Sequence, residues 1–382
     1  MKKDKIYPFF NEAAILFPVL LLSSIGVIMV YSASSAISIT KFGNNIFYLQ
    51  KQSLFFLISL LSMLLISFFP YRYFKFLSYF FVFLSIILLI IVQIPSIGVK
   101  AGGAYRWLRF GIFTFQPSEF TKFAFIIFLA YSLDKKQNMI RDFSVGFIPH
   151  VIIFIILAIL IMMQPDFGSV VILGLITWGM MFIAGVPIIH LLIPLPCLIP
   201  FCYFFLFKVG YRMERIFAFL NPWADPLNTG YQITHSLKAF GSGGIFGKGI
   251  GLSMQKLYYL PEPHTDFIFS VIGEELGLVG VFLILMLYSI ILWRGIKIAS
   301  NSRSFFATLL AFGLTLNLGI QVIINIGVTL GVLPTKGLTL PFLSYGGTSL
   351  FINMMAMGIL MNIGTSAKNM VHKTENKKLD LK

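Results

Sequence analysis

The sequence predicts an all-α polytopic membrane protein, and three observations support that fold class. The 382 residues are 58% hydrophobic and only 11% charged, whereas an average soluble domain has roughly 25% charged residues. The chain contains about ten apolar stretches of the roughly 20 residues that one bilayer crossing needs. Backbone amides in hydrocarbon have no water to bond, so each crossing is expected to be helical.

The ten expected spans occupy most of the chain. They cover residues 13–33, 49–69, 74–96, 118–133, 147–163, 168–185, 188–207, 266–293, 305–330 and 343–363. Pro149 and Pro187 fall near span ends, where proline is tolerated. Lys2, Lys3 and Lys5 precede the first span, but that span exceeds the roughly 7 to 15 apolar residues of a signal peptide, so we expect a retained helix.

Basic residues set the expected orientation. With the N-terminus inside, the cytoplasmic loops and the tail are rich in lysine and arginine, as the positive-inside rule requires. The loop residues concerned are Arg72, Lys75, Lys135, Lys136, Arg141, Arg294, Lys297 and Arg303. Both termini, residues 1–12 and 364–382, are therefore expected in the cytoplasm, around a membrane domain of residues 13–363. Topology then explains much of the net charge of +15 without a nucleic-acid partner.

One extracytoplasmic loop is much longer than the others. It joins the seventh and eighth spans, as residues 208–265. Loops of this length are usually functional or disordered. This one is not of low complexity, and its six glycines between residues 241 and 251 suggest turns packed against the bundle. We therefore expect any chemistry at the outer face.

Several acidic and basic residues lie within spans, where they are functional candidates by default. Glu119 and Lys122 are three residues apart, so they share a helix face and form either an intramembrane ion pair or part of a cavity. Glu274 and Glu275 follow Asp266 by about two turns. Adjacent helical residues point about 100° apart, so at most one of these two glutamates can face the same cavity as Asp266.

Three ordered motifs resemble the SEDS family, whose members are FtsW, RodA and SpoVE. The first is RWLR followed by FQPSEFTK within residues 106–122. The second comprises FLNPW, GYQ, GSGG, LPEPHTDFIF and GEELG within residues 219–277, and the third comprises LPTKGLTLP and SYGG within residues 333–347. His235 departs from the glutamine that is common in the family. The similarity covers nearly all of the transmembrane chain.

The resemblance implies a peptidoglycan glycosyltransferase. Such an enzyme polymerises lipid II into β-1,4-linked glycan strands and releases undecaprenyl diphosphate. The resemblance makes Asp266 the candidate general base and places Glu119 and Lys122 in the catalytic cavity. From its position alone, Asp266 could instead favour the start of the helix expected from about residue 266, through the helix dipole and cap geometry.

Further residues are candidates for substrate binding. Guanidinium groups match a diphosphate bidentately and can stabilise the leaving group, although anchoring at lipid headgroups is the alternative. The candidates are Arg106, Arg109, Arg212, Arg215, Lys336 and Asp166. For Asp166 the alternative is a cap of the sixth helix. The match of Ser253 and Lys256 to a Ser-x-x-Lys motif lacks the other motifs of penicillin-binding proteins and is attributed to chance.

The resemblance also implies a location and partners. The Lys336 form of the third motif is typical of FtsW and usually lacking in RodA, which favours a division enzyme at the septum of a bacterial inner membrane. A class B penicillin-binding protein, a transpeptidase, is the expected partner beside other divisome membrane proteins. The outer loop and the eighth and ninth helices, with Gly277 and Gly280, are the expected contact sites, unless these glycines pack internally.

Alternative functions remain open at this point. They are a lipid II flippase, a RodA-like elongation polymerase and a non-enzymatic divisome scaffold. The five histidines have no metal-ligand spacing, and Cys197 and Cys202 are interpreted as buried thiols. No protein metal site is therefore expected, while assistance of the diphosphate by a divalent cation such as Mg²⁺ is left open.

Overall fold

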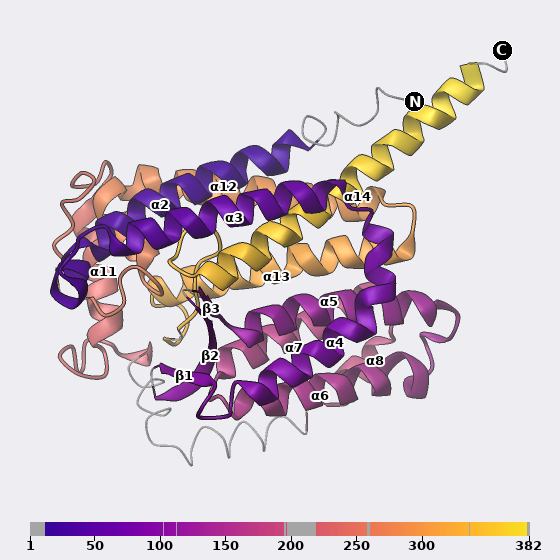
Figure 1. The fold of residues 1–382 in the computed structure, drawn as a ribbon, viewed down its shortest axis with the longest axis horizontal. Coiled ribbons are helices and arrows are strands. Elements are labelled where there is room, and N and C mark those ends of the chain that lie inside the picture. The colour runs from indigo at the N-terminus through magenta and orange to yellow at the C-terminus, as the bar shows by residue number, and fades with distance from the viewer. Residues whose placement is uncertain are drawn as a thin grey trace.

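The protein is a bundle of long helices with a small sheet at one end (Figure 1). The computed structural model describes residues 12–379 except residues 102, 112, 195, 197–218, 258–259 and 336, and it describes no side chains at residues 101, 110, 113 and 368–379. The helices longer than one turn are α2 (Ala13–Phe42), α3 (Phe47–Phe68), α4 (Phe74–Ile91), α5 (Pro117–Lys135), α6 (Ile148–Met162), α7 (Phe167–Ala184), α8 (Ile188–Leu192), α11 (Tyr231–Gly243), α12 (Ile268–Asn301), α13 (Phe305–Thr329) and α14 (Gly347–Leu379). Within the described residues, eight helices are long and apolar enough to cross a membrane.

The structure confirms a polytopic helical membrane protein. Nine of the ten predicted spans contain a helix of at least 15 residues within the described part of the chain. The tenth, residues 188–207, lies mostly outside the described residues, and α8 covers only its beginning. The expected loop of residues 208–265 also lies partly outside them, and its described part contains α11. The predicted division into segments 1–12, 13–363 and 364–382 stays a prediction.

Helix α5 lies in the interior of the bundle. It packs against α4, α13 and α7, and most of its residues are buried. Its 19 residues include Glu119, Lys122, Asp134 and Lys135, and this charge content keeps it out of the eight helices that are apolar enough to cross a membrane. Neighbouring helices rather than lipid surround it, so it can carry buried charges that a lipid-facing helix could not.

The prediction of an all-α protein was wrong at one segment. Residues 98–115 form an antiparallel sheet of three strands, β1 (Gly98–Ala101), β2 (Ala104–Phe110) and β3 (Phe113–Phe115), in the order β1-β2-β3. Gly103 and Gly111 have positive φ values of 84° and 60° at the two tight turns, a conformation that glycine adopts without steric cost. Gln116 after β3 donates its backbone N–H to Thr348 Oγ1 of α14, which ties the sheet to the bundle.

The two ends of the bundle differ in content. The sheet, α11 and the beginnings of α5 and α12 lie at one end, whereas the beginning of α2 and the end of α14 lie at the other (Figure 1). The predicted cytoplasmic arginines and lysines of the loops belong to helix ends and connections at this second end, which agrees with the positive-inside rule. We call the opposite end, with the sheet, the outer end.

Candidate functional site at the outer end

Glu119 and Lys122 form a buried ion pair in the first turns of α5. The Lys122 Nζ lies 2.8 Å from Glu119 Oε1, and the two side chains are 1% and 7% exposed. The spacing of three residues places them on one face, and a carboxylate near a helix N-terminus is favoured by the helix dipole. The ion-pair alternative is therefore observed, and the catalytic role of the two residues stays a prediction. A ligand phosphate that contacts Lys122 would have to share the lysine with Glu119.

Asp266 lies in the turn before α12, not in its first helical turn as predicted. The helix begins at Ile268, and its first hydrogen bonds end on the carbonyl of Phe267. The carbonyl of Asp266 instead accepts a hydrogen bond of 3.1 Å from the Asn325 side chain of α13. Asp266 is half-buried.

The turn that carries Asp266 is held by neighbouring segments. Ser344 Oγ donates a hydrogen bond of 2.5 Å to the carbonyl of Thr265, and the backbone N–H of Tyr345 donates one of 2.8 Å to the carbonyl of His264. The Asn325 amide also donates to the carbonyl of Leu338, at 2.6 Å. The second and third sequence motifs therefore meet at this turn.

Gly337 lies directly against the Asp266 carboxylate. A Cβ atom on Gly337 would lie 2.9 Å from Asp266 Oδ2, a distance at which the carboxylate would have to move. Only a hydrogen atom fits between the residue 337 backbone and this oxygen without a shift. The glycine of the third motif thus sets the space that is available to the carboxylate.

Asp166 caps α7 and faces α5. Its Oδ1 accepts the Ser169 backbone N–H at 3.1 Å and its Oδ2 accepts the Ser169 hydroxyl at 2.7 Å, so the capping alternative is observed, while the predicted role in substrate binding stays a prediction. The Ser118 hydroxyl donates to Oδ2 at 3.4 Å, one residue before Glu119. Gly168 packs against the Leu338 side chain. The α5 beginning, the α7 cap and the 337–338 segment therefore lie in one contiguous contact set beside Asp266.

The predicted basic residues differ in their surroundings. Arg106 on β2 donates from Nε to the carbonyl of Gln164 and from Nη2 to that of Pro165, both at 2.8 Å, and thereby fixes the sheet to the turn before Asp166. Arg109 on the same strand is exposed. The predicted ligands Arg212, Arg215 and Lys336 lie outside the described residues.

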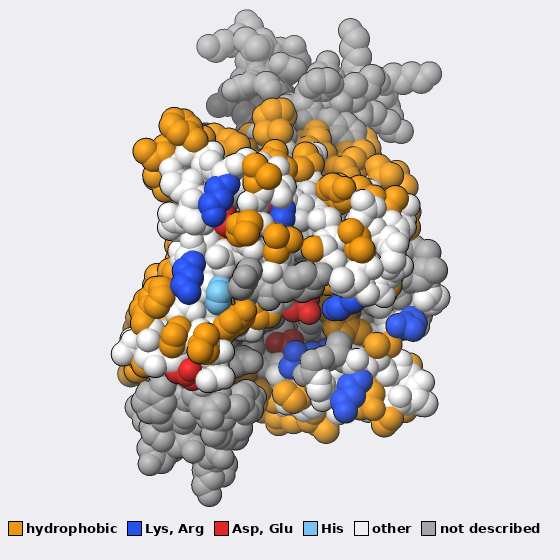
Figure 2. Space-filling model, turned by 90° about the vertical axis from the view of Figure 1, so that its left-hand side faces the viewer, with side chains coloured by type: hydrophobic (Ala, Val, Ile, Leu, Met, Phe, Trp, Pro, Cys, Tyr) orange, Lys and Arg blue, Asp and Glu red, His pale blue; other side chains and the backbone are white. Residues whose placement is uncertain are grey.

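Viewed face on, the outer end is hollowed near its centre. Figure 2 shows acidic and basic side chains together in this hollow, with hydrophobic side chains around it. Among the residues that the structure describes, no three His, Cys, Asp or Glu side chains are grouped so as to hold a metal ion. Buried His264 lies between the rings of Tyr48 and Tyr345, with centroid distances of 4.6 and 5.7 Å.

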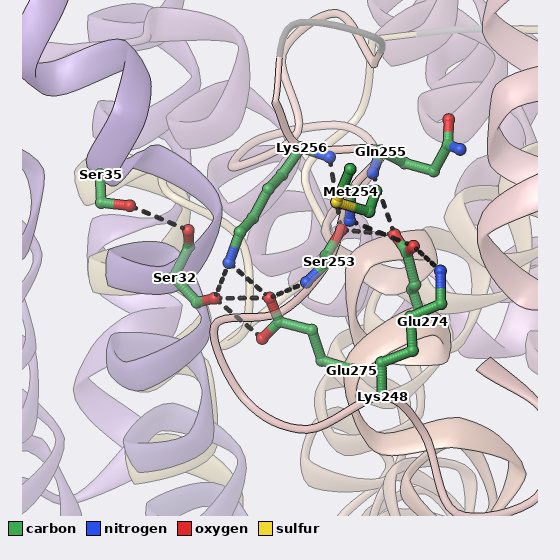
Figure 3. Close-up of polar contacts among 9 residues, drawn as sticks. All are labelled: Ser32, Ser35, Lys248, Ser253, Met254, Gln255, Lys256, Glu274 and Glu275. Atoms are coloured by element: carbon green, nitrogen blue, oxygen red, sulfur yellow. Dashed lines mark hydrogen bonds and ion pairs between the residues drawn. The ribbon is translucent and has the colours of Figure 1, made fainter. Parts of the chain in front are cut away.

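Sequence reasoning missed a second charged cluster, which we call the clasp. It consists of residues 244–256 of the outer loop together with Glu274 and Glu275 of α12 (Figure 3). Lys248 pairs with Glu274 at 2.7 Å, and Lys256 pairs with Glu275 at 2.7 Å. Both glutamates are buried, so each needed a partner. Two glutamates within an expected span were the signal in the sequence, but chain order does not identify their partners, since Arg294 is closer to Glu274 along the chain than Lys248 is.

Other clasp contacts bear on two earlier interpretations. Lys256 Nζ donates to Ser32 of α2 at 2.8 Å, and Ser32 donates to Glu275. The Ser253 hydroxyl donates to Glu274, whereas the Lys256 ammonium group contacts Glu275 and Ser32. The serine and the lysine of the Ser-x-x-Lys motif therefore bond different acidic residues, which supports the interpretation of this motif as chance. The two glutamates point to different partners, as their adjacency predicted.

The comparisons with known proteins agree with these motifs. A family model for FtsW, RodA and SpoVE, described as "Cell cycle protein", matches residues 12–369. The probable peptidoglycan glycosyltransferase FtsW of Geobacter metallireducens is 44% identical over 357 residues, which are 94% of this chain and 95% of that protein. Stage V sporulation protein E of Bacillus subtilis is 44% identical over 345 residues, which are 90% of this chain and 94% of that protein.

Solved structures of the same family are also similar to this chain. A chain from work on how a peptidoglycan synthase complex coordinates polymerization and crosslinking has a TM-score of 0.76 and 29% identity, over 92% of this chain and 97% of that one. The rod shape determining protein RodA of Thermus thermophilus has a TM-score of 0.67 and 27% identity, over 92% of this chain and 95% of that one. The chain therefore belongs to the FtsW/RodA/SpoVE family of cell cycle proteins.

Proposed function

We propose that this chain is a peptidoglycan glycosyltransferase that polymerises lipid II into β-1,4-linked glycan strands. The names of its relatives support the enzyme class. The observation that carries the proposal is the Asp266 carboxylate at the outer end, with its turn anchored by Asn325 and Ser344 and its space bounded by Gly337. A carboxylate held in this way can act as a general base on a lipid-linked sugar at the outer membrane edge.

The reaction needs one displacement. The 4-hydroxyl oxygen of the acceptor GlcNAc attacks the anomeric carbon of the donor MurNAc, and Asp266 takes the hydroxyl proton. The bond from that carbon to the diphosphate oxygen breaks, and its electron pair leaves with undecaprenyl diphosphate. A single in-line step converts an α-linked donor into a β-linked product, so no covalent carboxylate intermediate is needed.

The leaving diphosphate gains negative charge as the bond breaks. We assign Lys122, with its partner Glu119, and exposed Arg109 to stabilise that charge, together with Arg212, Arg215 and Lys336. Arg106 and Asp166 instead support the sheet and the α7 cap around the site. A divalent cation at the diphosphate would be detected by the effect of EDTA and added Mg²⁺ on polymerisation.

Proteoliposomes that contain lipid II provide the test. Wild-type protein should make glycan ladders, whereas Asp266→Asn, which keeps the shape and removes the basicity, should make none. Asp225→Asn is the matched control, because the Asp225 carboxylate bonds only its neighbours Asn228 and Thr229 among the described contacts. Glycan ladders at wild-type yield from Asp266→Asn would remove this residue as the base. Lipid II transport without polymer from the wild type would instead favour a flippase.

We further propose a division role in partnership with a class B penicillin-binding protein at the septum of the inner membrane. Glycan strands need a transpeptidase to cross-link them, and a solved relative comes from a peptidoglycan synthase complex. The lipid-facing sides of α12 and α13 expose large apolar side chains, among them Phe282, Met286 and Ile323. Full activity alone, with no co-purification of the transpeptidase, would defeat the partnership and leave the catalytic assignment untouched.

A further inference from the structure

Helix α12 is divided into two parts at Gly277. This residue has φ 63° and ψ −162° inside an otherwise helical run. The break leaves backbone N–H and C=O groups on both sides without helical partners, which is costly at membrane depth. The division yields a short outer half-helix, Ile268 to Leu276, and a long inner part that continues to Asn301.

The outer loop supplies the missing hydrogen bonds. Four backbone bonds of 3.0 to 3.1 Å cross between the two segments: Lys248 N–H to Glu274 O, Gly249 N–H to Glu275 O, Leu278 N–H to Gly244 O and Val279 N–H to Ile245 O. A Cβ on Gly277 would lie 2.3 Å from the backbone nitrogen of Gly247. Glycine is required there both for its positive φ and for this close approach. Gly277 therefore packs internally, against the loop.

Two ion pairs join the outer loop to the half-helix just before this break. Glu274 receives Lys248, whose side chain is 34% exposed, and Glu275 receives Lys256, whose side chain is 6% exposed. Ser32 adds a contact from α2 to the second pair. Both glutamates are the last charged residues of the half-helix before the break. The clasp thus grips the inner end of the half-helix, while Asp266 directly precedes its outer end.

From this geometry we propose that the clasp positions Asp266, and that Lys256 and Glu275 are positioning residues for the glycosyl transfer. The inference rests on the proposed role of Asp266. A helix of nine residues is about 13 Å long at 1.5 Å per residue. A tilt of about 5° at the clasp would therefore move the Asp266 end by about 1 Å, a misplacement that can cost up to about 100-fold in rate.

Two variants and one control isolate this effect. Lys256→Met removes the buried partner of Glu275, and Lys256→Arg retains the charge. Lys75→Met is the matched control, because Lys75 forms an ion pair of the same 2.7 Å length with Asp134 at the opposite end of the bundle. The measurements are hydrogen exchange of the segments 244–249 and 274–279, and the kcat and KM of lipid II polymerisation in proteoliposomes.

We expect Lys256→Met to raise exchange in both segments and to lower kcat by at least about 10-fold with KM nearly unchanged. Lys256→Arg should recover most of the rate, and Lys75→Met should match the wild type in both readouts. If Lys256→Met destabilises the whole protein, the double variant Lys256→Met/Glu275→Gln removes the unpaired buried charge and is measured in its place.

Two results would overturn the inference. Raised exchange with wild-type kcat would show that the clasp opens without moving the base, and unchanged exchange would show that the ion pair does not hold the clasp. An Asp266→Asn variant measured alongside keeps the two hypotheses separate. Its normal activity would refute the proposed base, whereas the exchange of the Lys256 variants still reports on the clasp.

Discussion

Removal of the Lys122 ammonium group should separate the structural role of the α5 ion pair from its role in donor use. Lys122→Met would leave the buried Glu119 carboxylate without its 2.8 Å partner. Breaking a buried pair on one side costs about 3 to 5 kcal/mol, because a charge stays buried without compensation. The double variant Glu119→Gln/Lys122→Met removes both charges and should recover most of that stability, since neutral replacement of a buried pair is often close to neutral.

Thermal unfolding and lipid II polymerisation, measured on the same three proteins, give the test. We expect the double variant to regain stability but not activity, because its diphosphate site has lost a cation. Lys75→Met provides the scale for a partly buried pair, whose side chains are 32% and 20% exposed, and it should cost less stability than Lys122→Met because solvent screens the remaining charge. Recovery of both stability and activity in the double variant would refute a role in donor binding and leave a purely structural pair.

Further outcomes follow from the contacts of Asp266 and from the charges around it. Lys122→Met should weaken lipid II binding more than Lys336→Met, because a charge in the predicted outer loop would be screened within about 8 to 10 Å at physiological salt; equal losses would reject this ranking. Gly337→Ala should displace the Asp266 carboxylate and lower kcat with little change in melting temperature, whereas Gly241→Ala, a position in α11 where an added Cβ meets nothing within 4 Å, should leave kcat unchanged. Burial, reinforced by the charge of Lys41, lowers the pKa of His264 to about 4. As the pH drops from about 6.5 to 4, the unfolded chain therefore takes up a proton at this imidazole that the folded chain does not. The free energy of unfolding should fall by up to about 3 kcal/mol over this range. If the melting temperature of His264→Gln fell with decreasing pH as steeply as that of the wild type, His264 would not be the source of this pH dependence.

The transmembrane architecture was predictable because bilayer physics leaves few alternatives. A stretch of about 20 apolar residues without backbone partners outside itself has to be helical, and the helices appear where such stretches occur. The sheet of residues 98–115 was missed because its strands have only four, seven and three residues. A signal existed, since the pair of glycines at residues 102 and 103 is typical of a two-residue hairpin.

Local relationships within the site were also predictable, and distant ones were not. The spacing of Glu119 and Lys122 gave their ion pair, and the position of Asp166 before an apolar run gave its cap. The contact between Gly337 and Asp266 joins residues far apart along the chain. Hydrophobic periodicity orders residues within one helix and carries no information about which outer turns meet. For those contacts the sequence offered only the family resemblance.

Irregular backbone at the outer end accounts for the polar side chains found around the candidate site. The turns at residues 264–266 and 337–344 are not helical, so their carbonyl and N–H groups need partners from elsewhere. Asn325 of α13 and Ser344 of the loop before α14 supply hydrogen bonds to such groups. Asn325 and Ser344 therefore serve the irregular backbone around Asp266. Because they supply these hydrogen bonds, the turn that carries Asp266 keeps backbone partners although the residue lies before the first turn of α12.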